Sequence, residues 1–183
     1  HDISFSGIVQ PCYCPGRLLR YGERARDYFM TRIAVIDVGS NAIRLLHVVV
    51  DASGATRDRS FRRYPLRLGT DVFERGALSR KTTAALVGVF EDIGQRFSEL
   101  GVDRYRAVAT SAMRDAGNSD QVIRRIERVT GIRLEVISGL EESCLSRAAL
   151  VRAVGSVTGG TLLVDLGGGS MEVERADGRG ALS

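Results

Sequence analysis

Apolar and polar positions alternate along the chain with two different periods, and the changes between the periods predict the order of elements. Short apolar runs rich in β-branched residues predict strands. These runs lie at 33–37, 43–51, 105–110, 132–138, 161–165 and 171–175, and a weaker one, dense in charge, falls within 56–68. The first two runs are joined by a short turn and predict a hairpin.

Apolar residues at helical spacing predict the helices between these strands. The first begins at a Ser79 cap and ends at Gly101, and the second ends at Gly131 after a cap at Asn118 or Ser119. Composition predicts a third helix from Glu141 to about residue 154. Strands that alternate with helices indicate an α/β fold, in which a mixed sheet is flanked by helices.

Two turns after apolar strands share one plan, an aspartate followed by small residues. They are Asp37–Asn41 and Asp165–Ser170. Glycines let backbone N–H groups approach a ligand closely, and successive N–H groups favour phosphate oxygens. A carboxylate repels phosphate, but it can hold Mg²⁺, which bridges to phosphate oxygens. One such turn is more often structural, whereas two predict a phosphate-binding cleft lined with acids.

The strand-turn-strand plan of 33–51 recurs at 161–175, with no helix after the second copy. We therefore expect residues 31–155 to form a first lobe and residues 156–183 to form the opening hairpin of a second, truncated lobe. Residues 1–30 hold two of the three prolines and show no clear period. We read them as an N-terminal extension outside the fold, with Met30 as the natural start.

Composition adds limits rather than a function. The 183 residues are 44% apolar and 26% charged, which predicts a packed core, and the net charge of +4 fits a polyanionic ligand without requiring one. Cys12, Cys14 and Cys144 are an odd set without zinc-site spacing, so free thiols are expected. No apolar run approaches the roughly 20 residues of a membrane span, and we expect a soluble, cytoplasmic protein.

Four segments resemble the Ppx/GppA phosphatases, the exopolyphosphatases and guanosine pentaphosphate phosphohydrolases of the actin-like ATPase (ribonuclease-H-like) superfamily. The segments are Asp37–Leu45, Ala109–Asn118, Ile137–Glu142 and Asp165–Glu172. The glycine turns are shared with sugar kinases and actins, whereas the two middle segments are specific to the family. The resemblance covers residues 32–175. It implies two lobes, each offering a phosphate-binding hairpin to a shared cleft.

The resemblance also implies roles for individual residues. Glu142 matches the catalytic glutamate that activates the attacking water. Asp37, Asp165 and Glu172 match the ligands of Mg²⁺. The phosphate-binding positions are Gly39, Ser40, Asn41, Thr110, Ser111, Arg114, Gly168, Gly169 and Ser170.

The residues taken alone leave plainer alternatives open. Arg114 could form a surface ion pair with Asp115 or Asp120. Asn118 could be a simple helix cap, and the carboxylate of Glu141 is favoured at a helix start by the macrodipole.

The chain departs from the family pattern at several positions. Ala42 stands where a second serine is common, Met171 replaces a common threonine, and Ser143-Cys144 replaces Ala-Arg. The last change removes an arginine that could partner the catalytic carboxylate or the substrate. With the second lobe truncated, we expect the 183-residue chain itself to be nearly inactive.

Three functions follow as hypotheses. The first is a phosphohydrolase acting on polyphosphate or guanosine pentaphosphate, which would connect it to the stringent response. The second is an actin-like kinase or ATPase, against which the Glu141-Glu142 pair argues. The third is a non-enzymatic module that binds polyphosphate or an alarmone. We expect a homodimer at full length, and neither a membrane nor a specific nucleic-acid sequence as partner.

Overall fold

The fold was analysed in a computed structural model that describes residues 10–11, 30–155, 160–169 and 171–176. The side chains of residues 10, 11, 172 and 174–176 are not described. The predictions for Cys12, Cys14 and Ser170 therefore lie outside the described residues.

The described residues form a six-stranded mixed sheet in the order β1-β5-β2-β3-β4, with β6 paired to β5. The strands are β1 (Gln10–Pro11), β2 (Thr31–Val38), β3 (Ile43–Val50), β4 (Thr56–Tyr64), β5 (Arg104–Ala109) and β6 (Glu135–Val136). Strands β2, β3 and β4 are antiparallel, whereas β5 runs parallel to both β2 and β6. Strands β7 (Thr161–Leu166) and β8 (Met171–Ala176) form a separate antiparallel hairpin.

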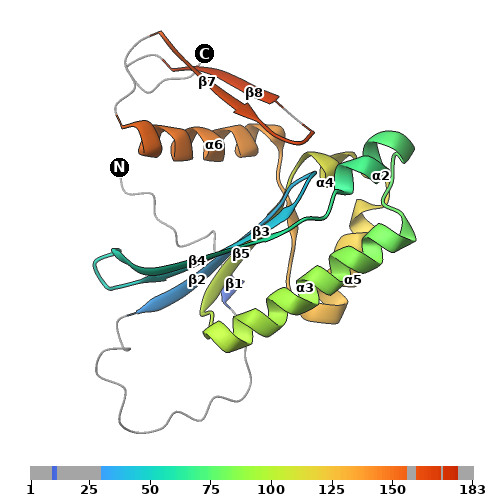
Figure 1. The fold of residues 1–183 in the computed structure, drawn as a ribbon, viewed down its shortest axis with the longest axis horizontal. Coiled ribbons are helices and arrows are strands. Elements are labelled where there is room, and N and C mark those ends of the chain that lie inside the picture. Colours follow the sequence, from blue (N-terminus) through green and yellow to red (C-terminus); the bar gives the residue numbers. More distant parts are fainter. Residues whose placement is uncertain (1–9, 12–29, 156–159, 170, 177–183) are drawn as a thin grey trace, which may run out of the picture.

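Five helices lie between these strands among the described residues. They are α2 (Leu68–Arg75), α3 (Arg80–Leu100), α4 (Ser111–Asp115), α5 (Ser119–Thr130) and α6 (Gly139–Val154). Figure 1 shows α3 and α5 on one side of the sheet, with α6 and the β7–β8 hairpin on the other. The mixed sheet with flanking helices agrees with the predicted fold class.

The core lies between the sheet and α3, because alternate residues of the central strands β2 and β3 are buried on that face. Ala34, Ile36 and Val38 of β2 are buried there, and Leu86 and Phe90 of α3 are fully buried. Other members of the core come from α2, α4 and α5. The residues between the buried positions of β2 point to the opposite face, toward α6 and the hairpin.

Helix α3 begins and ends where the sequence predicts. The Ser79 hydroxyl accepts a hydrogen bond from the Thr82 N–H, as a helix N-cap does. Gly101 has a left-handed conformation with φ of 64°, and its N–H donates to the Phe97 carbonyl.

Several elements differ from the sequence prediction. Helices α2 and α4 were not predicted. The strand expected over 132–138 is only Glu135–Val136, because Ile132 and Leu134 pack into the core outside the ladder. Helix α6 begins at Gly139, two residues early, because the Ser138 side chain accepts from the Glu141 N–H.

Two further expectations concern cysteine and membranes. Cys144 is a free thiol, as predicted. In the part of the chain that the structure describes, no helix has the length and apolar character that crossing a membrane requires.

Candidate functional site

A cavity of about 540 Å³ lies where the two predicted glycine turns meet the start of α6. Ten of the predicted site residues line it: Asp37, Gly39, Ser40, Asn41, Thr110, Ser111, Glu142, Asp165, Gly168 and Gly169. Residues from β2, β5, α6 and the β7–β8 hairpin thus come together at one place, although they are up to 132 positions apart in the sequence (37 to 169).

The floor of the cavity is a row of neighbouring side chains across the sheet. Val108, Asp37, Arg44 and Arg63 are register partners on β5, β2, β3 and β4 in turn. All four line the cavity. Arg44 Nη1 lies 2.9 Å from Asp37 Oδ2, and both side chains are at least 40% exposed, so solvent screens this ion pair. We call Val108, Asp37, Arg44 and Arg63 the floor row.

The first turn is closed by backbone hydrogen bonds. The Gly39 N–H donates to the Ala42 carbonyl at 3.1 Å, and the Gly69 N–H of α2 donates to the Ser40 carbonyl at 2.9 Å. Ser40 and Ala42 are both buried. The unpredicted helix α2 therefore braces the turn from outside the cavity.

The turn of the β7–β8 hairpin lies against the first turn without room for side chains. A Cβ on Gly168 would collide with Asn41 Nδ2, and a Cβ on Gly169 would collide with Phe73 Cζ of α2. The same Cβ on Gly169 would lie 2.7 Å from Ser40 Oγ and 2.8 Å from Ser111 Oγ. The side chains of Asn41, Phe73, Ser40 and Ser111 thus occupy the space that a Cβ on Gly168 or Gly169 would need.

A hydrogen bond links the turn of the hairpin to the start of α4. The Ser111 hydroxyl donates to the Gly169 carbonyl at 3.3 Å. Ser111 opens α4, directly after Thr110, whose N–H donates to the Val38 carbonyl at the end of β2. The ends of β2 and β5 thus position the two hydroxyls predicted to bind phosphate beside the hairpin turn.

Glu142 lies in the first turn of α6 and is fixed by Arg114. Arg114 Nη1 donates to Glu142 Oε2 at 2.9 Å and to the Ile137 carbonyl at 3.0 Å. The side chain of Glu142 is 17% exposed, and that of Arg114 is 27% exposed. Within the described part of the chain, Glu142 Oε1 accepts no hydrogen bond, so this oxygen is available to a group in the cavity.

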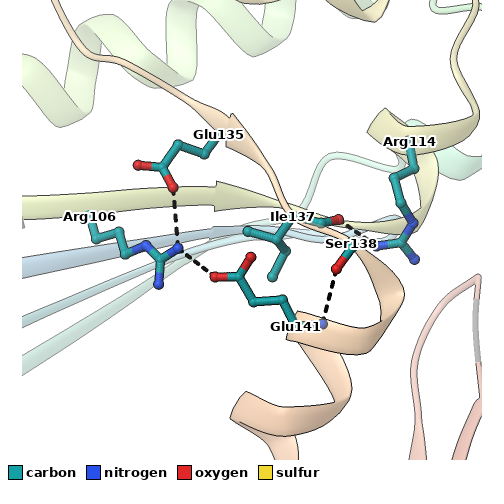
Figure 2. A network of polar contacts seen from close by, with 6 residues as sticks. All are labelled: Arg106, Arg114, Glu135, Ile137, Ser138 and Glu141. Atoms are coloured by element: carbon teal, nitrogen blue, oxygen red, sulfur yellow. Dashed lines mark hydrogen bonds and ion pairs between the residues drawn. The ribbon is translucent and has the colours of Figure 1, made fainter. Parts of the chain in front are cut away.

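The neighbouring Glu141 is held by a different arginine, as Figure 2 shows. Arg106 Nη2 lies 2.7 Å from Glu141 and 3.2 Å from Glu135. Burial opposes the charge of Arg106, but the hydrogen bonds and charges of Glu141 and Glu135 outweigh it and raise the pKa of Arg106. Glu141 does not line the cavity. The two adjacent glutamates therefore have separate environments.

Arg114 was predicted to contact phosphate, with a surface ion pair to Asp115 or Asp120 as the alternative. The structure instead pairs it with Glu142, and it is not among the residues that line the cavity. Its contact with phosphate stays a prediction. Arg114 thus provides Glu142 with an arginine partner, although Ser143-Cys144 replaces the Ala-Arg pair that commonly follows this glutamate.

Asn118 precedes α5 but does not cap it through its side chain. Its amide accepts from the Leu78 N–H at 2.9 Å and donates to the Leu78 carbonyl at 2.8 Å. The side chain thereby ties the segment before α3 to the segment before α5.

Sequence reasoning missed Ser146. Its hydroxyl donates to Asp165 Oδ2 at 2.6 Å, joining α6 to the hairpin. Leu145, Ser146 and Ala149 of α6 line the cavity together with Glu142. Their spacing of three, four and seven residues from Glu142 places them on one helix face, which is the signal that could have found them.

The cavity contains carboxylates that could hold a magnesium ion. Asp37 and Asp165 both line it, and Glu172 is the register partner of Asp165, with a side chain outside the description. Among the described side chains, no three histidine, cysteine, aspartate or glutamate residues gather as a ligand group. Mg²⁺ is typically held by one or two carboxylates with waters and substrate phosphates, so Asp37 and Asp165 fit it.

The sequence of the chain resembles those of known proteins. Residues 49–180 match the model of the Ppx/GppA phosphatase family. The chain is 35% identical over 142 residues to exopolyphosphatase 1 of Mycobacterium leprae, covering 78% of this chain and 42% of that protein. It is 36% identical over 152 residues to exopolyphosphatase 2 of Mycobacterium tuberculosis, covering 79% of this chain and 48% of that protein.

Solved structures give the same result. The Ppx/GppA family member of Aquifex aeolicus superposes with a TM-score of 0.70 at 32% identity, over 81% of this chain and 48% of that one. An exopolyphosphatase from Cytophaga hutchinsonii gives a TM-score of 0.72 at 27% identity, over 81% and 47%. The chain thus spans less than half the length of these relatives.

The mixed sheet, its flanking helices and the glycine-turn hairpin define a lobe of the actin-like ATPase fold. This class contains proteins of many activities, and the fold alone does not choose among them. The family match is narrower. The chain belongs to the Ppx/GppA phosphatase family.

Proposed function

We propose that the full-length protein is a phosphohydrolase that removes the terminal phosphate of inorganic polyphosphate or of guanosine pentaphosphate. The observation that carries the proposal is that both glycine turns and Glu142 line one cavity. Two relatives that are about one third identical to the chain are exopolyphosphatases by name, which supports the same reaction class.

The turns supply the binding groups. Backbone N–H groups and the hydroxyls of Ser40, Thr110 and Ser111 would bind the oxygens of the terminal phosphate. Asn41 and the glycines 39, 168 and 169 border the same space. Phosphoryl transfer depends mainly on positioning and on neutralising charge, which these donors provide.

Glu142 is the proposed base. Arg114 holds Oε2, so Oε1 would accept a proton from the attacking water. The water oxygen then bonds to the terminal phosphorus while the bond from phosphorus to the bridging oxygen breaks. The products are orthophosphate and a chain one phosphate shorter.

Asp37 and Asp165, with Glu172, would hold Mg²⁺. When bound, this ion would neutralise charge that builds up on the phosphate oxygens in the transition state.

The test is phosphate release by the full-length protein, with Mg²⁺, from long-chain polyphosphate, guanosine pentaphosphate and ATP in parallel. Release from either of the first two should fall about 100-fold or more in Glu142→Gln, the scale of a lost general base. Glu141→Gln is the matched control, because Glu141 lies next in sequence but outside the cavity. It should stay near wild type.

Two results would overturn the proposal. Release from ATP alone would identify a kinase or ATPase of the same fold. Binding of polyphosphate with no release from any substrate would identify a binding module.

A further inference from the structure

Strand β4 carries a line of side chains that leads out of the cavity. Arg63, Phe61 and Arg59 alternate along the strand and share one face, because side chains repeat every two residues. Their register partners on β3 are Arg44, Leu46 and Val48. Arg63 belongs to the floor row, so this is the face that bears the cavity. All three side chains are exposed.

The arginines of β4 fall into two groups. Arg57 forms an ion pair with Asp51, and Arg62, which points to the other face, lies 3.6 Å from Asp92. Arg59 and Arg63 have no ion pair within the described part of the chain. The cavity face of β4 therefore presents two cationic groups that pair with no carboxylate of the described residues.

The two charges stand in a row with a defined spacing. They are four positions apart on an extended strand, which at a rise of about 3.3 Å per residue is roughly 13 Å between Cα atoms. Phe61 lies between them with 58% of its surface exposed and offers phosphate no hydrogen bond. An extended anion with charge along its length is the kind of ligand that can contact both arginines.

We propose that Arg63 and Arg59 form a binding path for the internal phosphates of a long linear polyphosphate whose end occupies the cavity. The path makes this site select long chains over short ones. A triphosphate seated in the cavity reaches Arg63 at most, whereas a long chain continues to Arg59. The inference rests on the proposed function and names its preferred substrate class.

Equilibrium binding of long-chain polyphosphate and of tripolyphosphate, measured at several salt concentrations, tests the path. The variants are Arg59→Gln, Arg63→Gln and the double variant. Arg62→Gln is the matched control, since it makes the same charge change one residue away on the opposite face. Glutamine keeps most of the side-chain length, and these exposed positions lie outside the core.

For long-chain polyphosphate, the double variant should bind at least tenfold more weakly at low salt. The slope of log affinity against log salt should flatten by about 1.5, by analogy with the 0.7–0.9 per phosphate contact seen for nucleic acids. Arg59→Gln should weaken long-chain binding while leaving tripolyphosphate unchanged. Arg62→Gln should leave the slope and the ratio of the two affinities unchanged.

Equal losses for both ligands in Arg59→Gln, or a loss in Arg62→Gln as large as in Arg59→Gln, would overturn the path. The proposed function is judged separately, by turnover in the full-length protein. If the full-length protein turns over polyphosphate, but the double variant keeps the wild-type ratio of long-chain to tripolyphosphate affinity, the path is wrong and the proposed function stands. A chain-length preference that the double variant abolishes, without turnover, supports the path and overturns hydrolysis.

Discussion

Substituting Gly169 by alanine should detach the β7–β8 hairpin from the lobe. The added Cβ would crowd Phe73 Cζ and lie within 2.8 Å of the hydroxyl oxygens of Ser40 and Ser111. Phe73 is half exposed and can rotate away, whereas Ser40 and Ser111 are buried and their side chains have less freedom to move. We therefore expect the exposed hairpin turn to move instead.

The structure sets the size of the effect. Overpacking of this kind costs about 1–3 kcal/mol, and loss of the Ser111 to Gly169 hydrogen bond costs about 1 kcal/mol more. The sum of about 2–4 kcal/mol shifts the docking equilibrium roughly 30- to 700-fold, at about 1.4 kcal/mol for each factor of ten.

Amide hydrogen exchange measures whether the hairpin is docked on the lobe. A two-stranded hairpin alone is marginally stable in water, so a detached hairpin should lose protection at its ladder amides in 161–166 and 171–176. The amides of β2 and β5 should keep theirs. Adding Phe73→Ala to Gly169→Ala should restore little of the protection, because Phe73 can already rotate away and the contacts with Ser40 and Ser111 remain.

Gly88→Ala is the matched control. Gly88 lies in α3 with nothing within 4 Å of a Cβ, so alanine there should stabilise the protein by about 0.5–1 kcal/mol. Hairpin protection in Gly169→Ala equal to that of the wild type would refute the reasoning about close approach.

Three further predictions concern stability, measured as the free energy of unfolding. Burial lowers the pKa of His47, so the unfolded state binds a proton more readily than the folded state. The free energy of unfolding should therefore fall below about pH 6.5, by up to 1.4 kcal/mol per pH unit. His47→Leu should flatten this fall, and an unchanged slope in the variant would contradict the prediction. Ser79→Ala should cost about 1 kcal/mol through the lost cap on Thr82, and no loss in urea unfolding would show that the cap is unimportant. Arg106→Met should cost about 2 kcal/mol, because it leaves both Glu141 and Glu135 without their ion-pair partner, and an increase in stability would contradict this prediction.

The sequence predicted those parts of the fold that depend on local signals. Both ends of α3 follow from a cap and a glycine that act within one turn. Helix α2 was missed because Leu68 and Val72 are its only buried side chains larger than glycine. Its stability comes from packing against the core and against the first turn, and a pattern along the chain does not contain that information.

For the candidate site, the sequence predicted which residues come together but not which side chains pair with each other. The two aspartate-led turns and Glu142 were identified from the sequence and lie together in the structure. The partner of Glu142 was not identified, since Arg114 lies 28 positions away and had nearer acids to pair with. The bond from Ser146 to Asp165 was missed for the same reason, because it depends on how α6 lies against the hairpin.

The floor row has a consequence for how the chain reaches its native pairing. Ile36 and Asp37 are neighbours on β2 and point to opposite faces, one into the core and one into the cavity. A slip of one residue in the strand register would exchange them. It would bury a carboxylate without a partner, at a cost of several kcal/mol.

The same holds for Arg44 and Leu45 on β3. The charged side chains of the cavity thus also disfavour misaligned strand pairings during folding, because only the correct register keeps them in contact with water. Replacing Asp37 and Arg44 together with apolar residues would leave the native packing intact but remove this penalty on misaligned chains.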